Sequence, residues 1–414
     1  MRRKKRKIKY RSFVLLLGIM IIPLILIVSN SKEEKKEIVT KDVIDSYVGK
    51  NIDELESFLQ DKNMSIKKDY QYSKEYDENK IIHTELKDKM VNVLISKGII
   101  DDKTYRDKKV DELGKVPIMM YHGIVDTTDN KYTGGNVDKD GYNRTSNAFM
   151  KDLEFYYEKG YRMIRLSDYV QGIIDVPLGL SPIILTFDDG NKNNFHVLGR
   201  NSDGTLQIDP NCAVGVMETF KKNHPDATVT ATFFLMNNLF NQKEYDEEIM
   251  HWLVEHGYDI GNHTTIHADF TSINTTKTQE VVGKQYQTLE RILKDKYVKI
   301  IALPFGSPYK KSHANYPYIL KGTYDGVSYE TEAALRVGWE PEVSPFNKDF
   351  DKTFLKRVRA YDNNGKEFDI EMCFKNLEKN RFISDGDKDM ITIPKKSNSK
   401  LNTNYTNVYV YSEE

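Results

Sequence analysis

Cysteine is scarce in this sequence, since a chain of 414 residues contains only two, Cys212 and Cys373. Two thiols cannot form a disulfide-stapled scaffold or a four-thiolate zinc site. Glycine (24 residues) and proline (12 residues) are also too few for a fibrous or linker-like chain. We expect both cysteines to be buried free thiols, while a bridge between them stays open.

The chain also has almost no net charge, with a formal value of −1. Residues 1–12 nevertheless contain eight arginines and lysines and no acidic residue, which leaves about −9 for the rest of the chain. A body with this acidic balance is a poor nucleic-acid binder, and no nucleic-acid partner is expected. Because 39% of the residues are hydrophobic and 30% are charged, the pattern indicates two or three soluble domains.

Only one long apolar run is present, and it lies near the start. Residues 13–28 are sixteen uncharged apolar residues directly behind the basic segment. This length falls between the ~20 residues of a spanning helix and the ~7–15 residues of a signal-peptide core. No small-x-small cleavage site follows, and basic residues favour the cytoplasmic side. We therefore predict a transmembrane signal-anchor at residues 13–30 with the rest of the chain outside the cell; the alternative is a cleaved signal and a secreted protein.

Residues 40–98 are expected to form a small α+β unit. Asn51 and Glu54 have capping-box spacing at the start of a helical pattern, and strand-like runs follow at 81–84 and 91–95.

This unit resembles a PASTA module, a wall-associated domain that occurs outside bacterial cells beside peptidoglycan enzymes. The resemblance rests on Val-Gly-Lys at 48–50, Ser-Lys-Gly at 96–98, and the single helix against a few strands. Asp88 and Lys89 stand where such modules carry a Pro and Gly turn. An unrelated α+β spacer is the alternative.

Strand-like and helical runs alternate over residues 116–396, between a charged linker at 99–115 and a polar, frayed tail at 397–414. Strands are expected at 117–121, 183–187, 229–235, 259–262, 299–303 and 333–337, and helices at 148–159, 214–222, 247–255 and 277–293. Such alternation predicts an α/β domain with a mostly parallel sheet, and about 280 residues is the right size for a barrel.

Two adjacent carboxylates, Asp188 and Asp189, follow the apolar strand 183–187 and precede Gly190. Residues just past the carboxyl end of a parallel strand lie at the face where ligands bind. Neighbouring aspartates ionise together cheaply only when a cation lies beside them. Asp-Asp-Gly is also an ordinary turn sequence, so the motif needs a partner before it indicates a site.

The partner motif is His263 and His267, which are spaced i and i+4 and so would share one face of a helical turn. Position 264 is threonine, so the glutamate base of His-Glu-x-x-His metalloproteases is absent. Two imidazoles and one carboxylate form a three-ligand site with open positions, which is typical of a catalytic metal. The sequence therefore predicts a metal site where the two motifs meet.

A third motif, Pro304-Phe305-Gly306, follows the apolar run 299–303 and can aim backbone N–H groups at an oxyanion. The ordered motifs Asp-Asp-Gly, His-x-x-x-His and Pro-aromatic-Gly together resemble the polysaccharide-deacetylase family (NodB homology, carbohydrate esterase family four). The likeness extends over about residues 116–395 and includes the first strand, which ends in His122.

The resemblance implies a distorted (β/α) barrel of the NodB-homology type and a role for each motif residue. Asp188 would be the general base, while Asp189, His263 and His267 would hold one divalent metal ion, Zn²⁺. Pro304 would border the substrate, and the Phe305 N–H would stabilise the oxyanion.

The sequence departs from the family pattern at two places. Members carry an arginine that orients the catalytic aspartate where this chain has Ala302, and no late Leu-x-His motif supplies a general acid. We consider His122 for the acid and Arg336 for the missing arginine. Trp339 is considered as a pocket wall. Plain core packing is the alternative for Arg336 and Trp339, and a hydrogen-bonded residue at the strand end is the alternative for His122.

The resemblance implies a hydrolase that removes N-acetyl groups from cell-wall glycan. The expected substrate is peptidoglycan N-acetylglucosamine, whose deacetylation gives lysozyme resistance. Two alternatives remain open: a polysaccharide O-acetyl esterase and a wall-binding protein without turnover.

Overall fold

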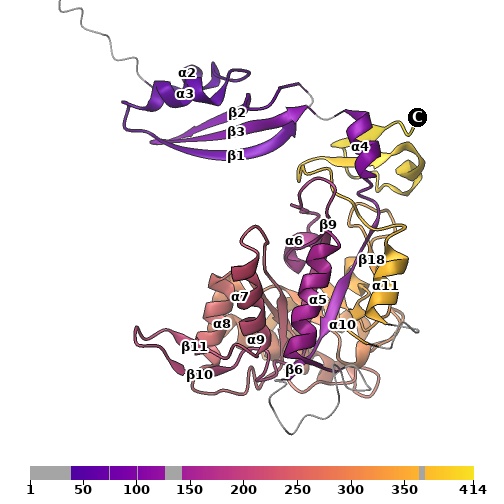
Figure 1. Cartoon of the computed structure of the whole chain (residues 1–414). Coiled ribbons are helices and arrows are strands. Elements are labelled where there is room, and N and C mark those ends of the chain that lie inside the picture. The colour runs from indigo at the N-terminus through magenta and orange to yellow at the C-terminus, as the bar shows by residue number, and fades with distance from the viewer. Residues whose placement is uncertain (1–38, 74, 100, 126–141, 363–368) are drawn as a thin grey trace, which may run out of the picture. The chain divides into compact units, whose positions relative to one another are not determined.

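The computed structural model describes residues 39–73, 75–99, 101–125, 142–362 and 369–414, which divide into two units after Gly98 (Figure 1). The predicted basic segment 1–12 and signal-anchor 13–30 lie outside the described residues. Within the described ranges, no helix is long and apolar enough to span a bilayer.

The first unit packs two short helices against one face of a three-stranded sheet (Figure 1). Its elements are α2 (Lys41–Asp45), α3 (Ile52–Leu59), β1 (Ser65–Ser73), β2 (Ile81–Lys87) and β3 (Met90–Ile99), with strand order β1-β3-β2. The predicted capping box is present at α3, where Asn51 accepts from the Asp53 N–H and Glu54 accepts from the Asn51 N–H.

Two elements of this unit escaped the sequence analysis. Strand β1 carries mostly polar residues and lacks the alternation that marks a half-buried strand. Helix α2 has five residues, too few for a helical period. At the β2–β3 hairpin, Asp88 has a φ of 53° and so makes the turn without a glycine. The resemblance to a PASTA module stays a prediction.

Replacing Asn51 by alanine is expected to weaken α3 by about 1 kcal/mol, because the helix loses its N-terminal cap. Hydrogen exchange of the α3 amides should then be about fivefold faster wherever exchange follows local opening. Gln60→Ala, at the exposed end of the same helix, is the control and should leave these rates unchanged. Equal rates in both variants would contradict the capping role.

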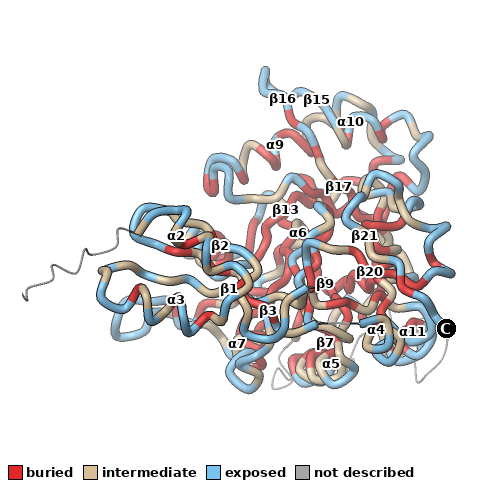
Figure 2. Tube along the Cα trace, turned by 90° about the horizontal axis from the view of Figure 1, so that it is seen from above, coloured by how far each residue is buried: buried red, intermediate tan, exposed pale blue. Residues whose placement is uncertain are grey.

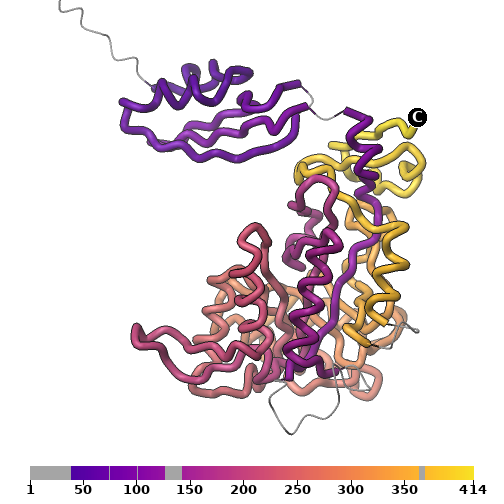
Figure 3. Tube along the Cα trace, in the orientation of Figure 1, coloured from indigo at the N-terminus to yellow at the C-terminus, as the bar shows by residue number. Residues whose placement is uncertain are grey.

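The second unit, Ile99–Glu414, is an α/β domain whose parallel sheet confirms the predicted class (Figure 3). The sheet order is β17 (Ala333–Leu335), β14 (Ile300–Ala302), β13 (Asp259–Asn262), β12 (Thr232–Leu235), β9 (Ser181–Phe187), β5 (Ile118–Tyr121) and β19 (Val358–Arg359), with β8 (Tyr161–Met163) also on β9. A bridge between Leu335 of β17 and Leu355, three residues before β19, brings the two ends of this path near each other. The sheet is therefore a strongly curved half-barrel.

Helices cover the outer face of this sheet. They are α5 (Ser146–Glu158), α7 (Ala213–Asn223), α8 (Asp246–Glu255), α9 (Thr275–Leu293) and α11 (Ile370–Leu377). Four of the five match helices that the sequence predicts. Figure 2 shows buried residues concentrated along the central strands.

Smaller elements complete the unit. The further helices are α4 (Asp102–Lys108), α6 (Leu166–Val170), α10 (Tyr316–Leu320), η1 (Lys294–Lys296), η2 (Pro304–Gly306), η3 (Lys352–Phe354) and η4 (Lys395–Lys400). The further strands are β4 (Lys115–Val116), β6 (Gly123–Val125), β7 (Asn143–Thr145), β10 (Val197–Arg200), β11 (Leu206–Ile208), β15 (Lys321–Tyr324), β16 (Val327–Glu330), β18 (Glu342–Val343), β20 (Ile391–Pro394) and β21 (Val408–Tyr411).

Side-chain alternation along the strands separates two cores. In β9, Ile183, Leu185 and Phe187 pack outward against the helices, whereas Ile184 packs inward. Because successive side chains point to opposite faces, Asp188 continues the inner row at the end of the strand. The alternation that places apolar side chains in the two cores therefore also points the Asp188 side chain to the inner face of the sheet.

The predicted linker and the predicted tail are both structured. Residues 99–115 contain α4, and residues 397–414 contain β21, which pairs in parallel with β20. Tyr105 is buried, and the centre of its ring lies 5.7 Å from that of the Tyr409 ring and 5.8 Å from that of the Tyr411 ring. The two segments therefore pack together (Figure 3). Residues 99–115 are mostly charged, so their sequence alone does not predict this long-range contact. Both cysteines are free thiols, as predicted, but only Cys212 is buried, and Cys373 is partly exposed.

Candidate metal centre

Most of the predicted site residues lie at the carboxyl ends of four strands of the parallel sheet, in which β12 lies between β9 and β13. His122 follows β5, Asp188 and Asp189 follow β9, His263 follows β13, and η2 follows β14. Because these strands are parallel, their carboxyl ends meet at one edge of the sheet. The sheet thus brings together motifs that are more than 180 residues apart in the sequence.

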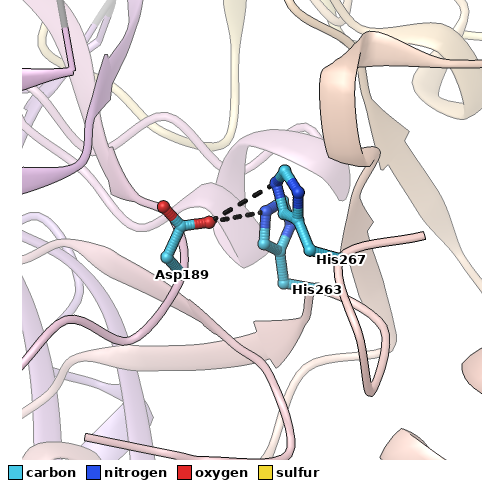
Figure 4. A group of neighbouring side chains, drawn as sticks. All are labelled: Asp189, His263 and His267. Atoms are coloured by element: carbon cyan, nitrogen blue, oxygen red, sulfur yellow. Dashed lines mark ion pairs between the residues drawn. The ribbon is translucent and has the colours of Figure 1, made fainter. Parts of the chain in front are cut away.

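Asp189, His263 and His267 form one cluster, in which the three candidate ligand atoms all lie within 4.8 Å of one another. The Asp189 Oδ1 lies 3.2 Å from His263 Nε2 and 3.6 Å from His267 Nε2, and both rings face the carboxylate (Figure 4). The backbone of Asp189 (φ 76°) and of His267 (φ 52°) is left-handed. These three residues are the ligand set that the resemblance implies.

The donor set fits a divalent cation. Asp189 Oδ1 and His263 Nε2 are buried and have no hydrogen-bond partner in the part of the chain that the structure describes. His263 Nδ1 lies 2.8 Å from the Ala302 carbonyl oxygen, an acceptor that fixes the proton on Nδ1 and leaves the Nε2 lone pair for a metal. Since buried polar atoms without partners are costly, a cation at this point would satisfy both. Imidazole and carboxylate ligands suit zinc.

The two histidines lie on a non-helical turn, which corrects the predicted helical turn. Asn262 Oδ1 accepts from the Thr264 N–H at 2.7 Å, and Thr264 Oγ1 accepts from the Ala268 N–H at 3.2 Å. Thr264 has a φ of 62°. These side-chain bonds replace helical backbone bonds and still bring both rings to one carboxylate.

Zinc is expected to stabilise the second unit, because the cation binds a cluster that only the folded chain assembles. At free zinc of about 100 times the dissociation constant, the gain is about 2.7 kcal/mol. Thermal unfolding with zinc and with a chelator measures it, and His267→Ala should abolish the difference. An equal zinc effect in the variant would place the binding elsewhere.

Asp188 is held by an arginine that the sequence analysis did not assign. Arg357 donates from its two terminal nitrogens to Asp188 Oδ1 and Oδ2, each at 2.7 Å, and both side chains are buried. Burial would raise the pKa of Asp188, but the charge of Arg357 and its hydrogen bonds outweigh it and hold the pKa well below its usual range. Asp188 is therefore an ionised, oriented carboxylate, as a general base requires.

Arg336 does not replace the missing arginine, contrary to our expectation. Its guanidinium lies 5.1 Å from the centre of the Phe354 ring, and its Nε donates to the Val337 carbonyl. Only its own carbonyl oxygen takes part, by accepting from Arg357 Nε at 3.1 Å. The run Leu355-Lys356-Arg357-Val358-Arg359 has no apolar strand pattern, so nothing local in the sequence pointed to Arg357.

His122 lies at the site, with its Nε2 3.9 Å from Asp188 Oδ2. Its ring is mostly buried, and Nδ1 has no hydrogen-bond partner. Burial lowers the pKa of His122, while Asp188 and Asp189 oppose this effect. The position is compatible with the predicted acid role, which stays a prediction.

The turn at η2 presents its backbone beside the metal ligands. Pro304 is buried, whereas the exposed Phe305 ring lies 4.4 Å from the His267 ring. Phe305 has a φ of 58°, and among the described residues its N–H donates no hydrogen bond. The predicted oxyanion donor is thus free to serve a ligand.

Trp339 lies at the same edge of the sheet but contacts none of the three ligands. Its ring is 4.4 Å from the Arg359 guanidinium, which is also 5.1 Å from the Tyr142 ring. The Tyr142 ring in turn lies 5.0 Å from that of His122. Trp339 therefore borders the site through Arg359, and its substrate role stays a prediction.

Comparisons with known proteins agree with the residues that form the site. Residues 176–317 match the family model described as polysaccharide deacetylase. A solved Bacillus anthracis protein described as a polysaccharide deacetylase shares 21% identity over 59% of this chain and 64% of its own, with a TM-score of 0.40. The Streptococcus pyogenes deacetylase PplD, solved with acetate, shares 16% identity over 64% of this chain and 98% of its own, with a TM-score of 0.45.

A search of curated proteins found no match. The chain spans slightly less than two thirds of the Bacillus anthracis protein. The family model ends at residue 317, so it contains both aspartates, both histidines and η2 but not Arg357. Residues 176–317, and not the whole chain, are thus similar to the polysaccharide deacetylase family.

Proposed function

We propose that this protein removes N-acetyl groups from a cell-wall glycan. The observation that carries the proposal is the cluster of Asp189, His263 and His267, with buried, unpaired ligand atoms, beside an aspartate that Arg357 keeps ionised. A three-ligand site with open positions is typical of a catalytic metal. Zn²⁺ is the proposed cofactor.

Each residue of the site has a defined task in this reaction. A divalent cation held by the three ligands would lower the pKa of water and polarise the acetyl carbonyl. Asp188 accepts the proton that the attacking water loses. The Phe305 N–H donates to the oxygen on which negative charge develops. Arg357 keeps Asp188 ionised and fixes the direction of its two oxygens.

The leaving amine needs a proton before the carbon–nitrogen bond breaks. His122 is our candidate donor, because its Nε2 lies 3.9 Å from Asp188 Oδ2 and therefore on the side of the site where the base acts. The products are acetate and a sugar with a free amine.

We propose peptidoglycan N-acetylglucosamine as the substrate and lysozyme resistance as the consequence. The support is the predicted signal-anchor at residues 13–30, which would leave the catalytic domain outside the cell as a single-pass membrane protein. A free amine on the sugar makes the wall a poorer lysozyme substrate.

The test uses residues 31–414, stripped of metal and then reloaded with zinc. Acetate and free amines released from peptidoglycan are counted, with Asp188→Asn as the inactive control. Equal amounts of both products support the proposal. Acetate without amines would instead show an O-acetyl esterase, and no acetate at any zinc concentration would leave a wall-binding protein.

A further inference from the structure

A buried polar network lies on the outer side of β5, between that strand and α5. The Tyr121 hydroxyl donates to Asp152 Oδ2 at 3.0 Å, and it lies 2.8 Å from the Tyr156 hydroxyl. Arg144 donates to both oxygens of Asp152, with Nε 2.7 Å from Oδ2. All four side chains are buried, and none of them belongs to the metal ligand set.

The network joins the two chain segments that carry His122 and Arg357. Tyr121 is the last residue of β5 and directly precedes His122. Arg144 Nη1 lies 2.6 Å from Asp362 Oδ2, just beyond β19 and five residues after Arg357. Asp152 is thus bonded to the last residue of β5 and, through Arg144, linked to the chain segment that follows Arg357.

Tyr121 also contacts the strand that carries the base. Its carbonyl oxygen accepts from the Asp188 N–H at 3.0 Å, and its ring stacks on Phe187 at 5.3 Å. Its side chain faces α5, while the His122 ring faces the site. Fixing the Tyr121 ring therefore fixes the backbone between the base and the proposed acid.

Core packing alone does not explain this arrangement. Replacing a buried ion pair by apolar side chains of similar volume is often neutral or stabilising. Burial raises the pKa of Tyr121, which keeps the phenol neutral and able to donate. A bidentate arginine pair with a phenol donor defines position and direction more narrowly than apolar contacts do.

We propose that Tyr121, Asp152 and Arg144 form a positioning unit that sets the distance between His122 and Asp188. The inference rests on the proposed function, since it assigns these residues to proton transfer in amide hydrolysis. Tyr156 lies outside the unit, because its hydroxyl bonds only to that of Tyr121.

The test compares Tyr121→Phe with Tyr156→Phe in the zinc-loaded protein. Each variant loses one buried hydroxyl and keeps its ring. Two substrates are used: an N-acetylglucosamine oligomer, whose amine must be protonated to leave, and 4-nitrophenyl acetate, whose leaving group departs without a proton. Tyr121→Phe should lower kcat on the amide about tenfold, with KM unchanged and the ester rate preserved. Tyr156→Phe should change neither rate.

Several outcomes would overturn the proposal. If Tyr121 had a purely structural role, Tyr121→Phe would lower the amide rate and the ester rate by the same factor. Equal losses in Tyr121→Phe and Tyr156→Phe would likewise contradict the proposal. If the wild-type protein deacetylates no glycan, the proposed function fails, but crystal structures of the variants still test the positioning. The His122 Nε2–Asp188 Oδ2 distance, 3.9 Å in the native chain, should change only in Tyr121→Phe, and an unchanged distance would refute the unit.

Discussion

Replacing His263 by alanine should lower kcat/KM for glycan deacetylation at least about a thousandfold, because the cation contributes several kcal/mol to the reaction. His263 is fully buried, and among the described residues its Nε2 makes no hydrogen bond and lies 3.2 Å from Asp189 Oδ1. Metal analysis should show less than one zinc per chain in the variant at a zinc concentration that saturates the native protein. Acetate release measured on the same samples then links the loss of metal to the loss of activity.

The matched control is His251→Ala, because His251 is an exposed histidine on α8. This variant should keep full zinc content and full activity. If His263→Ala retained one tightly bound zinc, the cluster of Asp189, His263 and His267 would not be the metal site.

Arg357→Met should destabilise the second unit by about 3–5 kcal/mol, because the substitution leaves the Asp188 carboxylate buried without its cation. Asp188→Asn in the same chain removes that uncompensated charge and should restore most of the loss. Both tryptophans, Trp252 and Trp339, lie in this unit, so fluorescence during denaturant unfolding reports on it alone. Both variants should be inactive, since one disorders the general base and the other removes it.

Arg336→Met is the matched control, since the Arg336 guanidinium lies over the Phe354 ring and does not contact Asp188. It should unfold within about 0.5 kcal/mol of the native chain, as surface substitutions usually do. A loss in Arg336→Met as large as that in Arg357→Met would show that the Asp188 pair is not the cause.

The paired arginine also explains how the site tolerates Ala302. The family pattern places an arginine near Pro304. In this chain the guanidinium that binds Asp188 belongs to Arg357, which lies 169 residues after Asp188 in the sequence. The arginine of the family pattern and Arg357 would both orient the aspartate proposed as the general base, here Asp188, although the two arginines follow different strands. The departure from the motif therefore does not by itself indicate a loss of activity.

Local motifs were sufficient to find the metal ligands. Asp189 lies just after the apolar strand 183–187, His263 directly follows the strand 259–262, and His267 comes four residues later. The parallel sheet that the alternation of strands and helices implies brings such positions to one edge. The capping box at Asn51 is likewise a local signal, because its two hydrogen bonds span only three residues. In these cases the interacting groups are close in sequence or share a repeated pattern.

Elements held by distant contacts were missed or misassigned. Residues of helix α4 were predicted to be a linker because most of them are charged. The contact that holds the helix is made by Tyr105, which packs against Tyr409 and Tyr411 some 300 residues away. Strand β21 looked like a frayed tail for the same reason. Arg336 was considered, and Arg357 was not, because the position of Arg336 next to an apolar strand can be read from the sequence, whereas the direction of a side chain cannot.

The sequence by itself determined the α/β class, the strands that the motifs follow, and the candidate metal ligands. These follow from the period of the apolar pattern and from the chemistry of a few side chains. Only the tertiary structure decided which arginine holds Asp188, how near His122 lies to it, and that a buried network joins the two strand ends. Those features depend on pairs of residues that are far apart in the sequence, and a local sequence pattern does not show which distant residues come into contact.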